Sequence, residues 1–199
     1  MSGRLGFFDV DCQEMNETCD GLSLRPRVQP LAEGITRLHA AAEAIGAPMV
    51  FTTCCSGRMP QPGDLPDTLF VPLGAADRGW EDHVADHRRF YLQKRAYRAP
   101  KVNVARRAFD MFQDNANADR LVKALQIDEW IVFGNAFDVC VACCAQGLLN
   151  AGQRVCLLAD VAALSVRGTQ ETLREMVEHF SHRGARTSTL NELLSLIDA

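Results

Sequence analysis

The sequence predicts one α/β domain built on a parallel β-sheet, and three observations support this prediction. Short continuous apolar runs, typical of strands buried on both faces, alternate with segments whose apolar residues recur at helical spacing. Acidic or basic residues follow several of the apolar runs, at the ends of strands where open parallel sheets bind ligands. No internal repeat or linker divides the 199 residues, so we expect a single domain over residues 1–199.

The order of the expected elements follows from this alternation. The first strand covers residues 5–11 and ends in acids, and a helix over residues 30–45 ends at Gly46. Residues 59–86 are rich in Pro, Gly and Asp, which indicates a long excursion beside the sheet. The other expected strands cover residues 48–51, 89–94, 130–133, 154–159 and 185–188, and the other helices cover 116–125, 169–180, 190–197 and a segment from Asp138 to Gly152.

Composition excludes several classes of function. Hydrophobic residues make up 47% and charged residues 23% of the chain, and the net charge is −4, so nucleic acid and anionic membranes are not expected partners. No apolar run is long enough to span a membrane, and the N-terminus lacks the pattern of a signal peptide. We therefore expect a cytoplasmic protein whose eight cysteines are mostly reduced thiols.

The segment 129–152 is the strongest candidate for a functional site. An apolar run is broken by Gly134, Asp138 is a suitable helix N-cap, and Cys140 then falls in the first helical turn. Unpaired N–H groups and the positive end of the helix dipole would favour a thiolate there. The alternative is that Cys140 is a small buried hydrophobic residue, as we expect for Cys143 and Cys144.

Two other strand ends carry charged residues. Asp9 and Asp11 are two residues apart, so a regular strand would place both side chains on one face, one for chemistry and one to support a loop; the alternative is a pair of turn-forming acids. Lys94 ends the expected strand 89–94 and precedes a basic segment, which could equally be solvated surface. A cation facing a thiol and a carboxylate from other strands is a catalytic arrangement.

Taken together, these segments of the chain resemble the isochorismatase-like cysteine hydrolases, which include nicotinamidases, carbamoylsarcosine amidohydrolase and isochorismatases. Residues 134–141 read Gly-Asn-Ala-Phe-Asp-Val-Cys-Val and resemble the family's nucleophile turn, Gly-Val-Ala-Thr-Asp-x-Cys-Val. Residues 7–13, Phe-Phe-Asp-Val-Asp-Cys-Gln, resemble the family's first strand ending in Asp-x-Gln. The resemblance covers nearly the whole chain in matching order.

The resemblance implies a fold, a triad and an oxyanion hole. The family has a three-layer α/β/α, Rossmann-like fold with a six-stranded parallel sheet, usually in a homo-oligomer such as a dimer or tetramer. Its Asp-Lys-Cys triad would be Asp11 as general base, Lys94 as the cation and Cys140 as nucleophile. The backbone N–H groups of Ala136 and Cys140 would form the oxyanion hole, with a cis peptide bond between Asn135 and Ala136.

Three departures from the family pattern refine this expectation. The metal site of the nicotinamidase branch, Asp-x-His, is replaced by Thr53-Cys54-Cys55, so no metal or other cofactor is predicted, and the role of Cys54 and Cys55 stays open. Isochorismatases that cleave a vinyl ether lack the nucleophilic cysteine, whereas this chain keeps Cys140. Spacing from an aromatic residue would instead assign the family lysine position to Arg106, but Lys94 is preferred because it ends a strand.

The sequence therefore predicts a metal-independent cysteine hydrolase that cleaves a C–N bond of a small amide or carbamoyl compound through a covalent acyl-enzyme. One alternative is an isochorismatase-type hydrolase that works without covalent catalysis. The other is a catalytically inactive binding member of the superfamily. The identity of the small-molecule substrate does not follow from the sequence.

Overall fold

The computed structural model describes residues 3–12, 18–19, 22–23, 29–53, 64–76, 79–94, 110–165 and 167–198. Most of its strands are buried runs of apolar residues, as expected for the middle layer of a three-layer domain. The strands are β1 Leu5–Val10, β2 Thr18–Cys19, β3 Leu22–Ser23, β4 Met49–Thr52, β5 Thr68–Val71, β6 Arg89–Leu92, β7 Glu129–Asn135, β8 Val155–Ala163 and β9 Arg186–Ser188.

Helices follow the strands in sequence, and two of them begin with a capping box. Thr169 and Thr189 each accept a hydrogen bond from the third residue of the following helix, which fixes where these helices begin. The α-helices are α2 Ala32–Ala44, α4 Met111–Asp114, α5 Ala118–Leu125, α6 Ala142–Asn150, α7 Gln170–His182 and α8 Leu190–Ile197. Shorter turns are the 3₁₀ segments η1 Gln29–Leu31 and η2 Trp80–Asp86 and the π-helical turn η3 Phe137–Val141.

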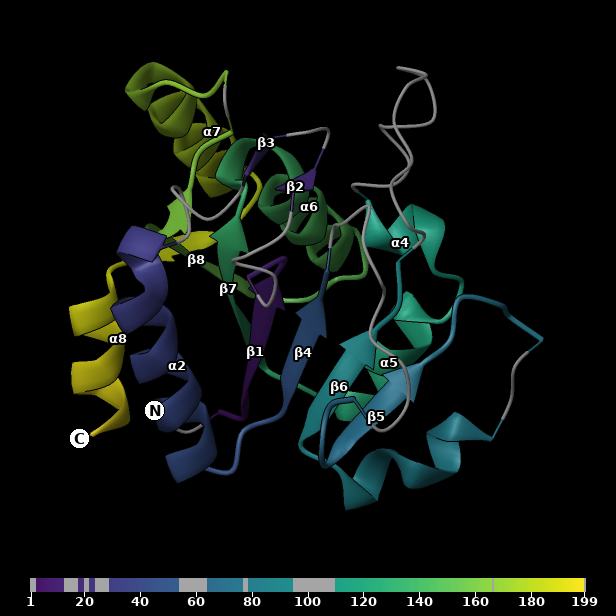
Figure 1. Ribbon diagram of the computed structural model, residues 1–199. Coiled ribbons are helices and arrows are strands. Elements are labelled where there is room, and N and C mark those ends of the chain that lie inside the picture. Colours follow the sequence, from purple (N-terminus) through teal and green to yellow (C-terminus); the bar gives the residue numbers. More distant parts are fainter. Residues whose placement is uncertain are drawn as a thin grey trace.

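The sheet has the strand order β5-β6-β4-β1-β7-β8-β9, and all its neighbouring strands are parallel. In Figure 1, β1 lies at the centre and helices cover both faces of the sheet. The predicted α/β fold with a parallel sheet is confirmed. The expected number of six strands is wrong by one, because residues 68–71, inside the segment interpreted as an excursion, form edge strand β5 on β6.

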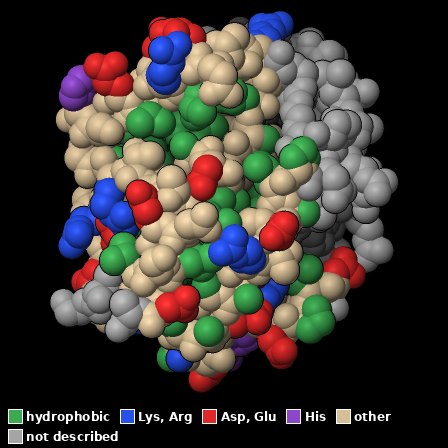
Figure 2. Space-filling view, turned by 90° about the vertical axis from the view of Figure 1, so that its left-hand side faces the viewer, with side chains coloured by type: hydrophobic (Ala, Val, Ile, Leu, Met, Phe, Trp, Pro, Cys, Tyr) green, Lys and Arg blue, Asp and Glu red, His purple; other side chains and the backbone are tan. Residues whose placement is uncertain are grey.

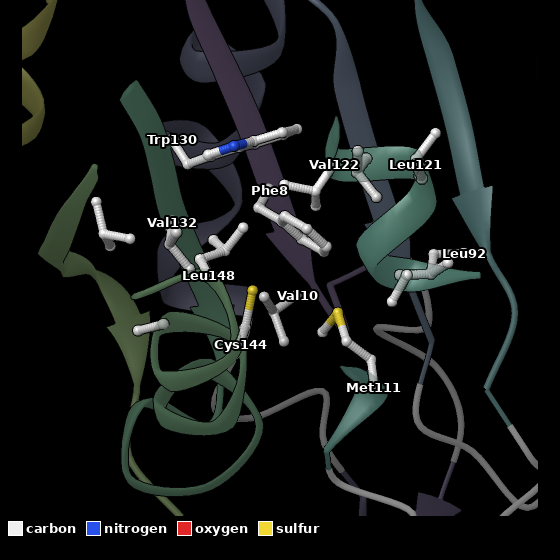
Figure 3. Packing of buried hydrophobic residues seen from close by; sticks show 14 of the residues in the cluster. Phe8, Val10, Leu92, Met111, Leu121, Val122, Trp130, Val132, Cys144 and Leu148 are labelled. Carbon is white, nitrogen blue, oxygen red and sulfur yellow. The ribbon is translucent and has the colours of Figure 1, made fainter. Parts of the chain in front are cut away.

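Each face of the sheet carries its own hydrophobic core. Residues of α2 and α8, such as Leu38 and Leu193, pack on one face. The other core lies under α4, α5, α6 and α7, and Figure 3 shows Phe8, Val10, Trp130, Cys144 and Leu148 packed together there. Because neither β1 nor β7 is exposed on either face, the strand ends between the two cores are held rigidly.

The closest approach of β1 and β7 requires a glycine at the end of β7. Gly134 has a φ of +126°, and a Cβ added to it would lie 2.1 Å from the carbonyl oxygen of Val10. Val10 and Gly134 are register partners, so the two strands deliver the residues that follow them, Asp11 and Asn135, to the same edge of the sheet. The glycine that breaks the apolar run in the sequence therefore sets the spacing of the candidate site.

The face of the molecule seen in Figure 2 carries side chains of mixed type. Figure 2 shows acidic and basic side chains interspersed with single hydrophobic residues over the face that it presents. Among the described residues, no helix is both long and apolar enough to cross a bilayer.

We predict that Gly134→Ala lowers the free energy of unfolding by about 3 kcal/mol or more, because the new Cβ meets the Val10 carbonyl in a left-handed conformation. Gly152→Ala is the matched control. It also has a positive φ, +76°, but the described atoms leave open space around its Cβ, so its loss should be about 1 kcal/mol. Urea unfolding of both variants measures the difference, and equal losses would contradict the role of the Gly134–Val10 contact.

Candidate active site

A buried ion pair joins the ends of two strands. Lys94 lies two residues after β6, and its Nζ donates hydrogen bonds to Asp11 Oδ1 at 3.1 Å and Oδ2 at 2.8 Å. Both residues are almost completely removed from solvent, with exposed fractions of 1% for Lys94 and 4% for Asp11. Two charges that have lost their hydration depend on each other, so neither can be removed alone without a large cost.

The carboxylate of Asp11 is oriented by its backbone and by a neighbouring strand. Asp11 has a φ of 57°, in the left-handed region, directly after β1. Its N–H donates to the carbonyl oxygen of Thr52 at 3.0 Å, and the Thr52 hydroxyl donates to Asp11 Oδ1 at 2.7 Å. Thr52 was not singled out from the sequence. Its only signal was its position at the end of the strand that pairs with β1.

Lys94 is also placed by hydrogen bonds of its neighbour. The N–H of Gln93 donates to Val71 O at 3.2 Å, and Asn115 Nδ2 donates to Gln93 O at 2.8 Å. The chain is thereby fixed between β5 and the turn that leads into α5. Because Lys94 is the next residue, its side chain is directed from a fixed point toward Asp11.

Cys140 lies in the turn η3, between β7 and α6, and is 3% exposed. Its placement in the first turn after the strand agrees with the prediction. The expected role of Asp138 as helix N-cap is wrong, because Ala136 occupies the N-cap position. Asp138 instead accepts hydrogen bonds from the N–H of Ser165 at 2.7 Å and the Ser165 hydroxyl at 2.5 Å, which connect η3 to the segment after β8.

The charges of the ion pair influence the pKa values of two thiols on α6, those of Cys143 and Cys144. The pKa of Cys143 is raised to about 11, chiefly by burial and then by the charge of Asp110, while Lys94 lowers it and Asp11 raises it. Burial also raises the pKa of Cys144, with Lys94 lowering it and Asp11 raising it. The pairing of Val10 with Gly134 brings Asp11 to the edge of the sheet at which β7 leads into the turn η3 with Cys140.

The peptide bond between Asn135 and Ala136 is cis, as the resemblance implies. Asn135 ends β7 and is 5% exposed, and Ala136 is 8% exposed. The backbone N–H groups of Ala136 and Cys140 therefore lie in one short segment at the carboxyl end of the sheet. Whether they stabilise an oxyanion stays a prediction.

Asp9 and Asp11, which the sequence predicts to lie on one face of the first strand with different roles, have different partners. The Asp9 side chain is fully buried, and its Oδ2 lies 2.7 Å from Nε2 of His39 on α2. The left-handed backbone at Asp11 ends the regular alternation of β1 and directs the second carboxylate toward Lys94. His39 was missed from the sequence, although it lies beside Leu38 on the buried side of an apolar helix.

Of the three residues at the metal position of the nicotinamidase branch, the structure describes Thr53 alone. Thr53 is buried, and its hydroxyl is hydrogen-bonded to the Tyr91 hydroxyl at 2.7 Å. Cys54 and Cys55 lie outside the described residues, as does Arg106, the alternative to Lys94. Within the described part of the chain, no group of three or more His, Cys, Asp or Glu side chains could hold a metal ion.

A groove of about 640 Å³ lies between α4, α6 and α7, next to the turn that carries Cys140. Its lining includes Val139 and Cys143 but not Cys140. The five cysteines whose side chains are described are all free thiols. Cys140 is thus distinguished from Cys143 by its position at the strand end and not by access from this groove.

Comparison with known families gives one match that spans nearly the whole chain. The family model described as the isochorismatase domain matches residues 7–192. No curated protein matches the chain in sequence.

Solved structures with the same fold include three enzymes of different names. The nicotinamidase from Staphylococcus aureus has a TM-score of 0.61 and 18% identity, covering 94% of this chain and 100% of that chain. An isochorismatase from Pseudomonas putida KT2440 has a TM-score of 0.62 and 14% identity, covering 95% and 89%. N-carbamoylsarcosine amidase from Thermoplasma acidophilum has a TM-score of 0.59 and 13% identity, covering 94% and 96%. At these identities the similarity shows the fold alone.

We predict that Lys94→Met lowers the free energy of unfolding by about 3–5 kcal/mol, because it leaves the Asp11 carboxylate buried without its cation. Asp11→Asn combined with Lys94→Met should recover more than half of this loss. Asparagine tolerates the left-handed backbone of residue 11 and removes the buried charge. Chemical denaturation of the single and double variants tests this; a double variant less stable than Lys94→Met would show that the pair is not the source of the effect.

Proposed function

Since the chain belongs to the isochorismatase family, we propose that it is a cysteine hydrolase that cleaves a C–N bond of a small amide or carbamoyl compound. Family membership indicates a hydrolase with a small-molecule substrate. The names of similar structures, a nicotinamidase and an N-carbamoylsarcosine amidase, support the choice of a C–N bond. The triad of this proposal is Asp11, Lys94 and Cys140.

The observation that carries the proposal is the buried Asp11–Lys94 ion pair at the edge of the sheet where β7 leads into the turn η3 with Cys140. A carboxylate fixed by Thr52 and Lys94 is a suitable proton acceptor, because its position does not change during the reaction. The charge of Lys94 favours a thiolate, and burial of the pair excludes water that would screen this effect.

In the first step, Asp11 accepts the thiol proton of Cys140 as Sγ attacks the carbonyl carbon of the substrate. A bond forms between sulfur and carbon, and the carbonyl π electrons move to the oxygen. The N–H groups of Ala136 and Cys140 would donate hydrogen bonds to this oxyanion. A single donor of this kind contributes roughly 3 kcal/mol of transition-state stabilisation in other enzymes.

In the second step, the oxyanion collapses and the C–N bond breaks. Asp11 gives its proton to the leaving nitrogen, and ammonia or an amine departs, leaving a thioester on Cys140. Water then attacks the thioester with Asp11 as general base. Breakage of the sulfur–carbon bond releases the acid and restores the thiol, so the cycle consumes one water and needs no metal.

The proposal also includes the wider expectations drawn from the family. We expect a homo-oligomer, a dimer or tetramer, in the cytoplasm. The metal-assisted route of nicotinamidases is not part of the proposal, because the buried Thr53 hydroxyl, already bonded to Tyr91, replaces an acidic ligand.

We predict that Cys140→Ala reduces the turnover of a substrate found by screening small amides and N-carbamoyl compounds by at least about 10³-fold, as expected for loss of a nucleophile. Cys143→Ala is the control and should keep activity within about threefold, because Cys143 belongs to the same helix but faces the groove. Ammonia release measures both. Full activity of Cys140→Ala would favour the isochorismatase-type hydrolase without covalent catalysis.

We also predict that iodoacetamide at pH 7.5 modifies Cys140 before Cys143. With a pKa of about 11, Cys143 has only about one thiolate in 3,000 molecules at this pH. Since the pKa of Cys143 is raised, its labelling should increase as the pH approaches 11, whereas Cys140 should react well below pH 8. Peptide mass spectrometry measures both rates, and a Cys140 that is labelled no faster than Cys143 would support an inactive binding protein.

A further inference from the structure

The side chain of Asn135 has an acceptor without a donor. Asn135 is 95% buried, and its Oδ1 makes no hydrogen bond with any residue that the structure describes. A buried amide oxygen left without a donor destabilises the fold, and buried polar groups in native proteins are nearly always paired. An unpaired acceptor at a strand end therefore requires an explanation.

The other buried asparagines that the structure describes, Asn115 and Asn117, do have partners. Asn115 Nδ2 donates to Gln93 O at 2.8 Å, and its Oδ1 accepts from the N–H of Asn117 at 2.8 Å. Asn117 Nδ2 donates to the carbonyl oxygens of Pro72 at 2.9 Å and Gly74 at 3.0 Å, and Arg120 donates to Asn117 Oδ1 at 2.6 Å. The side chains of Asn115 and Asn117 are thus hydrogen-bonded within the fold, whereas Oδ1 of Asn135 is not.

Asn135 is located where a substrate of the proposed reaction would bind. Val10 pairs with Gly134, so Asn135 comes beside Asp11 at the carboxyl edge of the sheet, where Figure 1 shows β7 between β1 and β8. On its other side Asn135 pairs with Ala163, a small residue without a polar side chain. The residue that follows is Ala136, the proposed oxyanion donor.

Asn135 is also a departure from the family's nucleophile turn, which has valine at this position. Valine offers no acceptor, whereas Oδ1 of Asn135 can accept one N–H or O–H group. With the carbonyl oxygen of the substrate held by the N–H of the very next residue, the donor must be close to the scissile carbonyl. The leaving nitrogen of any amide is also bonded to that carbon, but in the proposed reaction it faces Asp11, which protonates it, so the donor for Oδ1 has to be the other substituent of the carbonyl carbon. In a ureido group this substituent is an N–H group, whereas in a carbon-chain amide it is a CH2 group.

We propose that Asn135 is a specificity-determining residue whose Oδ1 accepts a hydrogen bond from the substrate, and that the preferred substrates are N-carbamoyl (ureido) compounds. The inference rests on the proposed function and narrows its substrate class. A carbon-chain amide leaves Oδ1 without its partner, and a site built for a hydrogen bond discriminates against an analogue that lacks it.

N-carbamoylglycine and succinamic acid test the proposal as a matched pair, because they differ only in N–H against CH2 beside the same carboxamide. Wild-type protein should show at least about tenfold higher kcat/KM for N-carbamoylglycine, and Asn135→Leu should reduce this preference to less than about threefold. If neither compound is hydrolysed, their protection of Cys140 against iodoacetamide is compared in the same way. A preference that is equal in wild type and Asn135→Leu would overturn the inference.

Thermal unfolding of the free protein gives a readout that does not depend on turnover. Asn135→Leu should raise the Tm by about 4 °C, because it replaces an unpaired acceptor by an apolar group of similar size. Asn117→Leu is the control and should lower the Tm, because it breaks three hydrogen bonds. A lower Tm for Asn135→Leu would show that Asn135 serves the fold, and this result would leave the proposed function of Cys140 intact.

Discussion

Two opposite charges, Asp11 and Lys94, face each other inside the protein, and the candidate site depends on this contact. Each charge has lost its hydration, so the fold must bring them together within hydrogen-bond distance or exclude both. Three strands share this task. β1 presents Asp11, β4 supplies the Thr52 hydroxyl, and β6 delivers Lys94 from two residues beyond its end. A parallel sheet suits this arrangement because all its strands end at one edge.

The large-scale fold and the main candidate residues could be predicted because their signals are local. Apolar runs that alternate with helical spacing indicate a parallel sheet, and the glycine after the run at 130–133 marks the turn to Cys140. Strand β5 was missed because its residues are only partly buried at the sheet edge and follow a segment rich in proline and glycine. An edge strand gains its identity from a neighbour, β6, that is more than fifteen residues away in sequence.

The contacts within the site could not be predicted, since they depend on side chains that meet only in three dimensions. The sequence places Asp9 and Asp11 together, but it does not say that His39 from a helix lies beside one and Lys94 beside the other. The left-handed backbone at Asp11 separates the two acids, and nothing in the sequence near it, such as a glycine, announces that conformation. Asp138 is a second example of such a contact. Aspartate is a favourable helix N-cap residue, but the side chain of Asp138 accepts a hydrogen bond from Ser165, which follows β8.

Two of the features that sequence reasoning missed lie at the carboxyl edge of the sheet, beside the candidate site. Rules that relate sequence to local structure describe which residues stabilise a fold. They therefore fail where a residue is kept although it lowers the stability of the fold. A non-glycine residue in the left-handed region and an asparagine oxygen without a donor among the described residues both disfavour folding, and both lie at the carboxyl ends of β1 and β7. Such costs are not confined to this edge, since Gln126 is also left-handed and Trp80 Nε1 also lacks a partner among the described residues. The buried side chains of Asn115 and Asn117, in contrast, are hydrogen-bonded. The left-handed backbone at Asp11 accompanies its ion pair with Lys94, and in our proposal a bound substrate supplies the hydrogen bond that Asn135 lacks.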